Sequence, residues 1–203
     1  TDVMMPEMDG IAMAKRIRAD KRTSHIPIIL LTARTSENHQ VLGFEAGVDD
    51  YLPKPFSFEI LESRIRNLIV QRELLRAAFQ KHIEVSPSEI SVTSLDEKLI
   101  KKAIEIVEKN ISNSEFSVEE LSREVGMSRV HLYKKLLALT GKSPIEFIRI
   151  LRLKRAAQLL RESQLSVSEI AYEVGFNNPK YFTKYFKAEF NTLPSQYATQ
   201  TKQ

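Results

Sequence analysis

The sequence predicts a partial α/β layer at the start of the chain, followed by an all-α domain in which a long helix joins two helix-turn-helix units. Three observations predict this fold class. Residues 1–57 alternate short apolar runs with helical patterns, as a parallel α/β layer does. From residue 94 onward every segment has a helical pattern, and most have a recognisable helix start. Within that helical part, one pattern occurs twice.

The composition of the 203 residues excludes several classes of protein. Because there is no cysteine, disulfide scaffolds, thiolate zinc sites and cysteine nucleophiles are excluded. The four histidines lack the spacing of metal ligands. Apolar runs fall far short of the roughly 20 residues that span a bilayer, so we expect no membrane contact by this segment. Since the chain does not begin with Met and shows no secretory signal, we expect a cytoplasmic part of a longer protein.

Charge is distributed unevenly along the chain. Residues 1–94 carry 12 basic and 13 acidic side chains, whereas residues 95–203 carry 18 basic and 13 acidic ones. A neutral front part and a basic back part indicate a polyanionic partner for the back part.

The front part is expected to form the α/β layer and one long helix. In chain order the apolar patterns predict a helix over 10–19, a buried strand over 26–31, a short helix over 40–46, a short strand at 51–52 and a helix from 58 to about 82. In the long helix, apolar residues recur at alternating spacings of four and three, with Arg72 in the one polar slot: Leu61, Ile65, Leu68, Leu75 and Phe79. This spacing favours a core or docking helix over a dimer seam.

A polar linker over 81–94 separates the front part from a series of helices. We expect helices over 95–111, 118–125, 129–140, 144–161, 167–174, 179–190 and 194–199. Four Ser-x-x-Glu capping boxes predict helix starts: Ser94/Glu97, Ser117/Glu120, Ser143/Glu146 and Ser166/Glu169. Pro144 and Pro179 each stand at a first helical position, where a missing N–H costs little.

An internal repeat is the most informative feature of the back part. Residues 117–126 (SVEELSREVG) align with residues 166–175 (SVSEIAYEVG) at an offset of 49, and the following helices align at an offset of 50. Each copy is a short helix, a turn that contains Gly126 or Gly175, and a longer helix, which is the helix-turn-helix pattern.

The second helix of each copy combines an apolar edge with a polar, basic edge. Leu132, Leu136 and Leu139 in the first copy and Phe182, Phe186 and Phe190 in the second are expected to face inward. The other edge holds Arg129, Val130, Tyr133 and Lys134 in the first copy and Pro179, Lys180, Thr183 and Lys184 in the second. Two such edges in a basic domain indicate double-stranded DNA as the partner. The helix over 144–161 also carries basic residues, some of which we expect to contact phosphate: Arg149, Arg152, Lys154, Arg155 and Arg161.

Residues 95–203 resemble the AraC-type DNA-binding domain. The resemblance is carried by Val118–Gly126, Ser128–Gly141 and above all the second copy, with Ile170-Ala171, Glu173-Val174-Gly175-Phe176, Tyr181-Phe182, Lys184, Phe186-Lys187, Pro194 and Tyr197. It implies two units that read successive major grooves and recruit RNA polymerase. It places the base-reading residues at Val130, Tyr133, Lys134, Pro179, Lys180 and Lys184. Members often carry Arg where this chain has Lys134 and Lys184, and lysine lacks the bidentate fork, which favours phosphate contact there. Asn191 stands where the family usually has glycine.

Residues 1–80 resemble the C-terminal part of a response-regulator receiver, which implies an incomplete flavodoxin-like fold. The motifs are Asp2–Gly10 (DVMMPEMDG), Leu31–Arg34 (LTAR), Gly47–Tyr51 (GVDDY) and Tyr51–Phe56 (YLPKPF). The resemblance makes Asp2 the phosphoacceptor, Thr32 and Lys54 the groups that bind the phosphoryl oxygens, Tyr51 the aromatic switch and Pro55 a cis-proline.

The receiver family also holds Mg²⁺ with two further acidic residues at the end of its first strand, and this sequence begins after that strand. Asp9, Asp49 and Asp50 are expected to be turn or cap residues. We therefore predict no cofactor for this chain, Mg²⁺ only in a complete receiver, and no phosphorylation of Asp2 in the chain as it stands.

Three functions are compatible with these motifs. One is a transcription regulator at the output end of a two-component phosphorelay, with a histidine kinase domain as a partner that can lie in the same chain. In that case this segment can be the cytoplasmic end of a membrane-anchored sensor. A second is a constitutive DNA-binding module whose front segment only dimerises or docks, with a homodimer as one outcome. The third, a haloacid-dehalogenase-type phosphatase, needs a second Asp where Met4 stands. We therefore expect no enzymatic activity.

Overall fold

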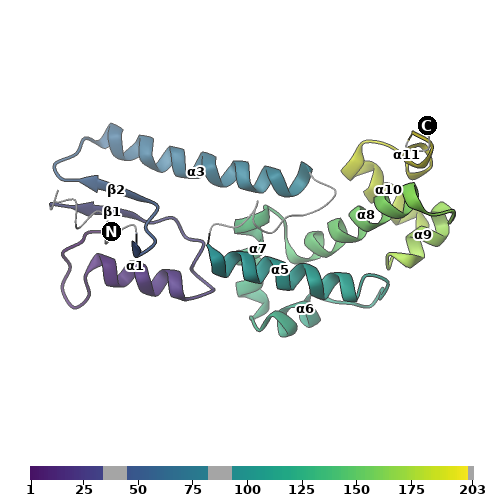
Figure 1. Cartoon of the computed structure of the whole chain (residues 1–203), viewed down its shortest axis with the longest axis horizontal. Coiled ribbons are helices and arrows are strands. Elements are labelled where there is room, and N and C mark those ends of the chain that lie inside the picture. Colours follow the sequence, from purple (N-terminus) through teal and green to yellow (C-terminus); the bar gives the residue numbers. More distant parts are fainter. Residues whose placement is uncertain (34–44, 82–92, 201–203) are drawn as a thin grey trace.

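The computed structural model describes residues 1–33, 45–81 and 93–200. It confirms the predicted fold class: a small α/β layer followed by a helical part (Figure 1). The α/β layer contains α1 (Gly10–Ala19), β1 (Ile29–Thr32) and β2 (Asp50–Pro53), and the long helix α3 (Phe58–Lys81) follows it. No helix in the described ranges is both long and apolar enough to cross a membrane.

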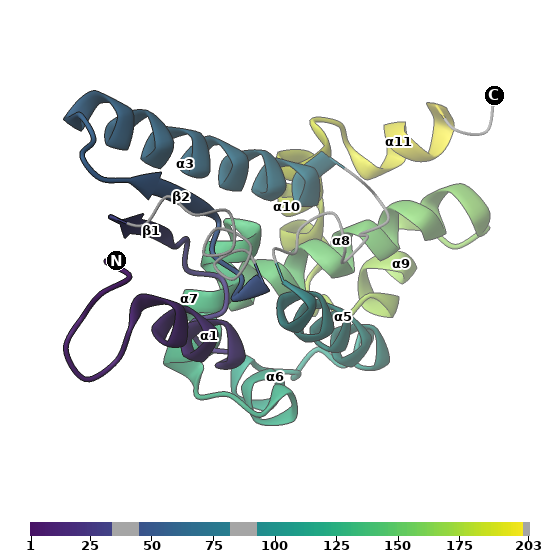
Figure 2. The same cartoon turned by 60° about the vertical axis from the view of Figure 1, so that its left-hand side comes forward.

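The two strands run parallel, with Ile29 paired to Asp50, and the segment at Asp2 adds a parallel bridge to Leu31. The sheet lies between α1 and α3 (Figure 2). Its buried residues form a small core with α1: Val3, Ala14, Ile28, Leu30, Ala46, Val48 and Tyr51. β1 begins later than the predicted strand over 26–31. Pro27 has no N–H, and the N–H of Ile28 donates to the Asp49 carboxylate at 2.7 Å, so neither residue donates a backbone hydrogen bond to the neighbouring strand.

The helical part follows the predicted boundaries to within one or two residues. It contains α5 (Ser94–Lys109), α6 (Val118–Val125), α7 (Arg129–Thr140), α8 (Pro144–Glu162), α9 (Val167–Glu173), α10 (Pro179–Phe190) and α11 (Pro194–Gln200). Three of the four capping boxes are present, at Ser117, Ser143 and Ser166. The fourth was wrong by one residue: the Thr93 hydroxyl caps α5 by accepting from the Asp96 N–H at 3.2 Å. Asn191 closes α10 in the left-handed conformation, with φ of 55°.

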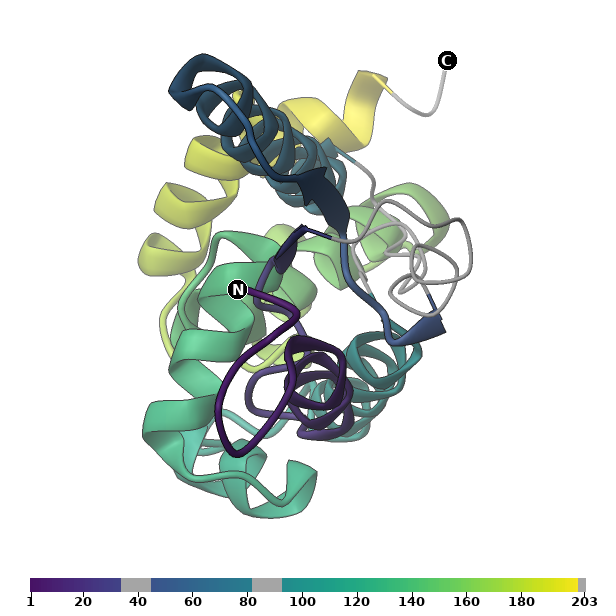
Figure 3. The same ribbon diagram turned by 90° about the vertical axis from the view of Figure 1, so that its left-hand side faces the viewer.

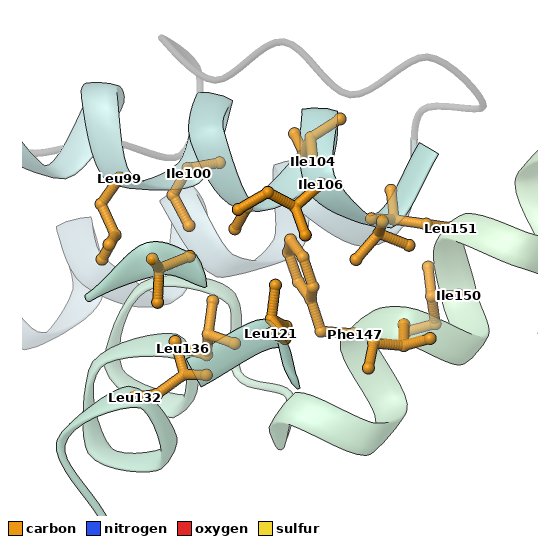
Figure 4. Close-up of a cluster of buried hydrophobic side chains, with 14 of the residues drawn as sticks. Leu99, Ile100, Ile104, Ile106, Leu121, Leu132, Leu136, Phe147, Ile150 and Leu151 are labelled. Atoms are coloured by element: carbon orange, nitrogen blue, oxygen red, sulfur yellow. The ribbon is translucent and has the colours of Figure 1, made fainter. Parts of the chain in front are cut away.

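Two separate cores hold the helical part together, and α8 contributes to both. In the first, Phe147 of α8 packs among buried residues of α5, α6 and α7, including Ile104, Leu121 and Leu136 (Figure 4). In the second, Leu153 and the alanines of α8 pack against α9 and α10. α8 is therefore the structural axis of the helical part.

The long helix α3 does not bury its apolar positions along its whole length, as an ordinary core or docking helix would. Leu61 and Leu68 are half-buried, but Ile65 is exposed. Arg72, the polar residue in the pattern, turns inward, and its guanidinium lies 3.6 Å from the Asp49 carboxylate. Asp49 is thus an ion-pair partner rather than a turn residue, whereas Asp9 caps α1 as predicted. The side chains of Leu75 and Phe79 lie outside the described residues, as do most of the predicted helix over 40–46 and most of the linker over 81–94.

Candidate nucleic-acid interface and receiver site

The first helix-turn-helix unit, formed by α6 and α7, leaves its basic edge open. The turn between the helices passes through Gly126, whose φ of 71° is readily adopted by glycine, and the Ser128 side chain then caps α7. Val130 is 62% exposed and Tyr133 47% exposed, and Lys134 is also exposed. Arg129 is exposed too, but its guanidinium pairs with Glu119 at 2.5 Å. Lys134, which pairs with none of the described residues, therefore faces outward together with the side chains of Val130 and Tyr133.

The second unit, formed by α9 and α10, places its basic edge in the same way. Asn178 caps α10, and Pro179 occupies the first helical position. Lys180 and Lys184 are exposed. The Thr183 hydroxyl donates to the carbonyl of Pro179 at 2.9 Å, so it is committed to the helix backbone in this structure. We call the two sets 129/130/133/134 and 179/180/183/184 the reading edges.

The opposite edges of α7 and α10 are buried, as predicted, and this orients the reading edges outward. Leu132 and Leu136 in α7 are fully buried, and so are Phe182 and Phe186 in α10. Phe186 lies in a cluster of rings, 4.6 Å from the centroid of Phe190 and 5.5 Å from that of Tyr197. Because the apolar edges are locked into two cores, neither helix can turn its basic edge inward without losing its packing.

Most basic residues of α8 are held by contacts within the protein, although we expected some of them to contact phosphate and the others to be solvated. Lys154 is buried, and burial lowers its pKa to about 8. The guanidinium of Arg149 lies 4.2 Å from the ring centroid of Tyr185, and that of Arg161 bonds the Tyr197 hydroxyl. Arg152 bonds two backbone carbonyls. Arg155 is exposed, as Arg161 is, and it bonds Gln158 on its own helix.

The structure brings the predicted receiver residues together at the carboxyl edge of the sheet. Asp2, Thr32 and Lys54 each stand at the end of one of three parallel segments. The Lys54 ammonium bonds the Asp2 carboxylate, and this hydrogen bond lowers the pKa of Asp2. Thr32 and Tyr51 are buried, and the Lys54–Pro55 peptide is cis. A carboxylate held beside a cation at a sheet edge is suited to a phosphoryl group.

The described residues at this edge do not fit a Mg²⁺ site. In the described ranges, His, Asp and Glu side chains form no cluster of three that could hold a metal ion. Asp2 is the sole carboxylate bonded to Lys54 there, and a hard divalent cation needs several oxygen ligands. The described residues therefore supply one ligand group and not a complete site.

Two family models match the chain, one over each part. A response regulator receiver domain matches residues 1–66, and a helix-turn-helix domain matches residues 121–200. The crystal structure of a transcriptional regulator with an AraC-type DNA-binding domain, from Chromobacterium violaceum, is similar with a TM-score of 0.51 and 27% identity, covering 55% of this chain and 98% of that one. The chain joins a response-regulator receiver segment to an AraC-type helix-turn-helix domain.

Some curated relatives that the chain matches are longer than the chain itself. Histidine kinase P4 from Formosa agariphila is 47% identical over 97% of this chain, which spans 14% of that relative. Response regulator MprA from Mycobacterium ulcerans is 33% identical over 59% of this chain and 50% of its own length.

The receiver segment docks onto the first helix-turn-helix unit of the AraC-type domain through a buried charged cluster that the sequence reasoning missed. Lys135 of α7 is 1% exposed and its ammonium lies 2.5 Å from the carboxylate of Asp96, which is fully buried in the first turn of α5. Ser24 of the receiver segment completes the cluster. Its hydroxyl donates to Asp96 at 2.9 Å and accepts from Lys135 at 2.7 Å. The sequence did contain a signal for the burial of Lys135, which lies within the apolar arc set by Leu132, Leu136 and Leu139. It contained no signal for the partners of this lysine.

Further contacts surround this cluster. The Lys21 ammonium donates to the carbonyl of Gly126 at 2.8 Å, and α3 packs against α7. His25 lies 3.1 Å from the Lys135 ammonium, and burial together with that cation lowers the pKa of His25 to about 4. Figure 3 shows the receiver segment close to α7. The docked segment leaves Val130, Tyr133 and Lys134 exposed, so it holds the first unit without covering its reading edge.

Proposed function

We propose that this chain is a DNA-binding transcription regulator of the two-component type, whose two reading edges contact successive major grooves of duplex DNA. The observation that carries this proposal is the repeated arrangement of the edges. Lys134 and Lys184 occupy the same position in two equivalent helices, and both are exposed while the other edge of each helix is buried. A single solvated helix face is ordinary, whereas two matched cationic edges on one domain fit a polyanion with a helical repeat.

The chemistry of each edge suits a different part of the duplex. Lysines gain free energy by releasing counterions from phosphate, and lysine can also donate to guanine in the major groove. Val130 and Tyr133 offer apolar surface for a thymine methyl group. To contribute to DNA binding, Arg129 must give up its ion pair with Glu119 for one with a phosphate group. Thr183 must likewise give up its hydrogen bond to the carbonyl of Pro179.

Changing Lys134 and Lys184 together to alanine is expected to weaken binding to a footprinted duplex. If each lysine neutralises one phosphate, the slope of log K against log salt should fall by about 0.9 for each lost contact. Binding is measured by fluorescence anisotropy at several salt concentrations. The control is Lys15→Ala with Arg16→Ala, which removes the same net charge from exposed positions on α1. Equal loss in both double variants would assign the effect to net charge and contradict the assignment of these edges.

The receiver segment is proposed to place the regulator under phosphorylation control in the full-length protein, with Asp2 as acceptor, Thr32 and Lys54 binding the phosphoryl oxygens and Tyr51 as switch. Mg²⁺, bound only in a complete receiver, would supply charge neutralisation. The chain as it stands should stay unmodified in acetyl phosphate and Mg²⁺, because the described residues give Asp2 no further metal ligands. Intact mass spectrometry checks this, and stoichiometric addition of one phosphoryl group would refute it.

The proposed partners are RNA polymerase and a histidine kinase domain. The similarity to a histidine kinase that is much longer than this chain supports a kinase in the same polypeptide, which would make this segment the cytoplasmic end of a sensor. A constitutive module is the second candidate, and the buried Ser24–Asp96–Lys135 cluster favours docking as the role of the front segment. In the other version of this second candidate, the front segment forms a homodimer. Light scattering over a range of protein concentrations separates docking within a monomer from dimerisation.

A further inference from the structure

The two helix-turn-helix units touch each other at a second place besides the continuous helix α8. Arg152, midway along α8, donates from one guanidinium nitrogen to the carbonyl of Asn113 at 2.6 Å. A second nitrogen donates to the carbonyl of Gly175 at 3.1 Å. Asn113 belongs to the turn that leads from α5 into α6, which we count with the first unit because α5 packs in the same core as α6 and α7. Gly175 belongs to the turn between α9 and α10 in the second unit. One side chain therefore bonds the backbone of both units.

The turn at Gly175 also lies directly against the first unit. A Cβ atom on Gly175 would lie 2.5 Å from the Ile111 carbonyl oxygen and 3.0 Å from the Arg152 guanidinium carbon. Gly126, its counterpart in the first unit, has nearly the same φ, yet a Cβ there would meet only the Lys21 ammonium at 3.5 Å. Glycine at 175 is thus required by a close contact between the units as well as by the turn.

Arginine is the side chain that this junction needs. Its rigid fork presents several N–H groups in fixed directions, so two carbonyls from different units can be bonded at once. Its Nε is buried and has no hydrogen-bond partner in the part of the chain that the structure describes. Arg155, three residues further along α8, is exposed and contacts neither unit in this way.

We propose that Arg152 is a positioning residue that sets the separation and angle between the two recognition helices, and thereby the spacing between DNA half-sites that the domain accepts. This inference rests on the proposed function. The 19-residue helix α8 spans about 28 Å and joins two separate cores. A single helix leaves the units free to twist about its ends, whereas a second attachment at Arg152 and Gly175 removes that freedom. One added base pair moves the two DNA half-sites apart by about 3.4 Å and rotates one relative to the other by about 35°. A small change in the angle between the recognition helices therefore changes which half-site spacing fits.

The test uses a duplex selected by the unaltered protein from a random pool, together with versions in which one or two base pairs are inserted or deleted between the protected half-sites. The unaltered protein should bind each altered duplex at least tenfold more weakly than the selected one. Arg152→Met should bind the selected duplex more weakly and reduce that spacing penalty at least threefold. Arg155→Met, on the same helix, should leave both the affinity and the penalty unchanged.

Several outcomes overturn the inference. Equal weakening of Arg152→Met on every duplex, with the penalty unchanged, would mean that Arg152 only supports folding. If circular dichroism shows that this variant is unfolded, the same measurement is made with Arg152→Lys, because an ammonium keeps the charge but cannot span both carbonyls. An unaltered spacing penalty in Arg152→Lys rejects the proposal. If the unaltered protein selects no duplex at all, the proposed function fails instead.

Discussion

Lys135→Met is expected to lower the free energy of unfolding by about 3–5 kcal/mol, because it leaves a buried carboxylate without its counter-ion. Asp96 is completely buried, and its Oδ2 has no hydrogen-bond partner within residues 1–33, 45–81 and 93–200. Without the Lys135 ammonium, the Ser24 hydroxyl is the one side chain left bonded to the Asp96 carboxylate among the described residues. Urea unfolding followed by circular dichroism measures the change.

The matched control is Lys134→Met, which replaces the adjacent, exposed lysine of α7 and should cost less than about 0.5 kcal/mol. Adding Asp96→Asn to Lys135→Met should restore most of the lost stability, since the buried charge is then removed rather than stranded. A cost for Lys135→Met no greater than that of the control would show that the cluster is not buried in solution.

The loss should be concentrated where the receiver segment meets the AraC-type domain. Hydrogen exchange is expected to increase in residues 20–28 and in the first turn of α5, while α9 and α10 keep their protection, because the second core does not touch the cluster. Uniform loss of protection along the chain would contradict a local docking role. DNA affinity of the second unit alone should be little affected.

Phe186→Ala is expected to cost about 3–5 kcal/mol, since it removes a fully buried ring from the centre of the second core. The ring contacts Phe182, Phe190 and Tyr197, with centroids 4.6 to 5.5 Å away. Because the first core is a separate cluster, α9–α11 should lose protection from hydrogen exchange before α5–α7 do. DNA binding should fall as well, because α10 would no longer be held in place.

Phe186→Leu is the control that the internal repeat suggests. Leu136 fills the equivalent position in the first unit, so a leucine at 186 keeps an apolar group of similar shape and should cost clearly less than alanine. Equal destabilisation by leucine and alanine would mean that ring contacts, and not filled volume, hold this core. Simultaneous exposure of both units in either variant would contradict the independence of the two cores.

Local patterns predicted most of the helical part. Helix starts were readable because Ser117 and Ser166 bond N–H groups three residues away, so a short stretch of sequence contains both partners. The inward faces of α7 and α10 followed from apolar spacing alone. The α5 cap was misplaced because Thr93 and Ser94 are adjacent hydroxyl residues, and only the backbone conformation decides which of them is outside the helix.

Side chains whose partners lie far away in sequence were not predictable. Lys135 corresponds in the repeat to Tyr185, which lies under Arg149, so the repeat itself gave no reason to expect a buried ion pair. Ser24 is 111 residues from Lys135 along the chain. Arg152 was one of five basic residues of which some were expected to contact phosphate. It bonds two backbone carbonyls, and neither carbonyl is identifiable from residue types.

The sequence by itself therefore determined the helices, the two repeated units, their buried faces and the exposed reading edges, since each depends on residues within a few turns of one another. Only the tertiary structure decided how the receiver segment docks on the first unit and how Arg152 joins the two units. Those arrangements depend on burial and on the approach of distant backbone, which periodicity and capping do not encode.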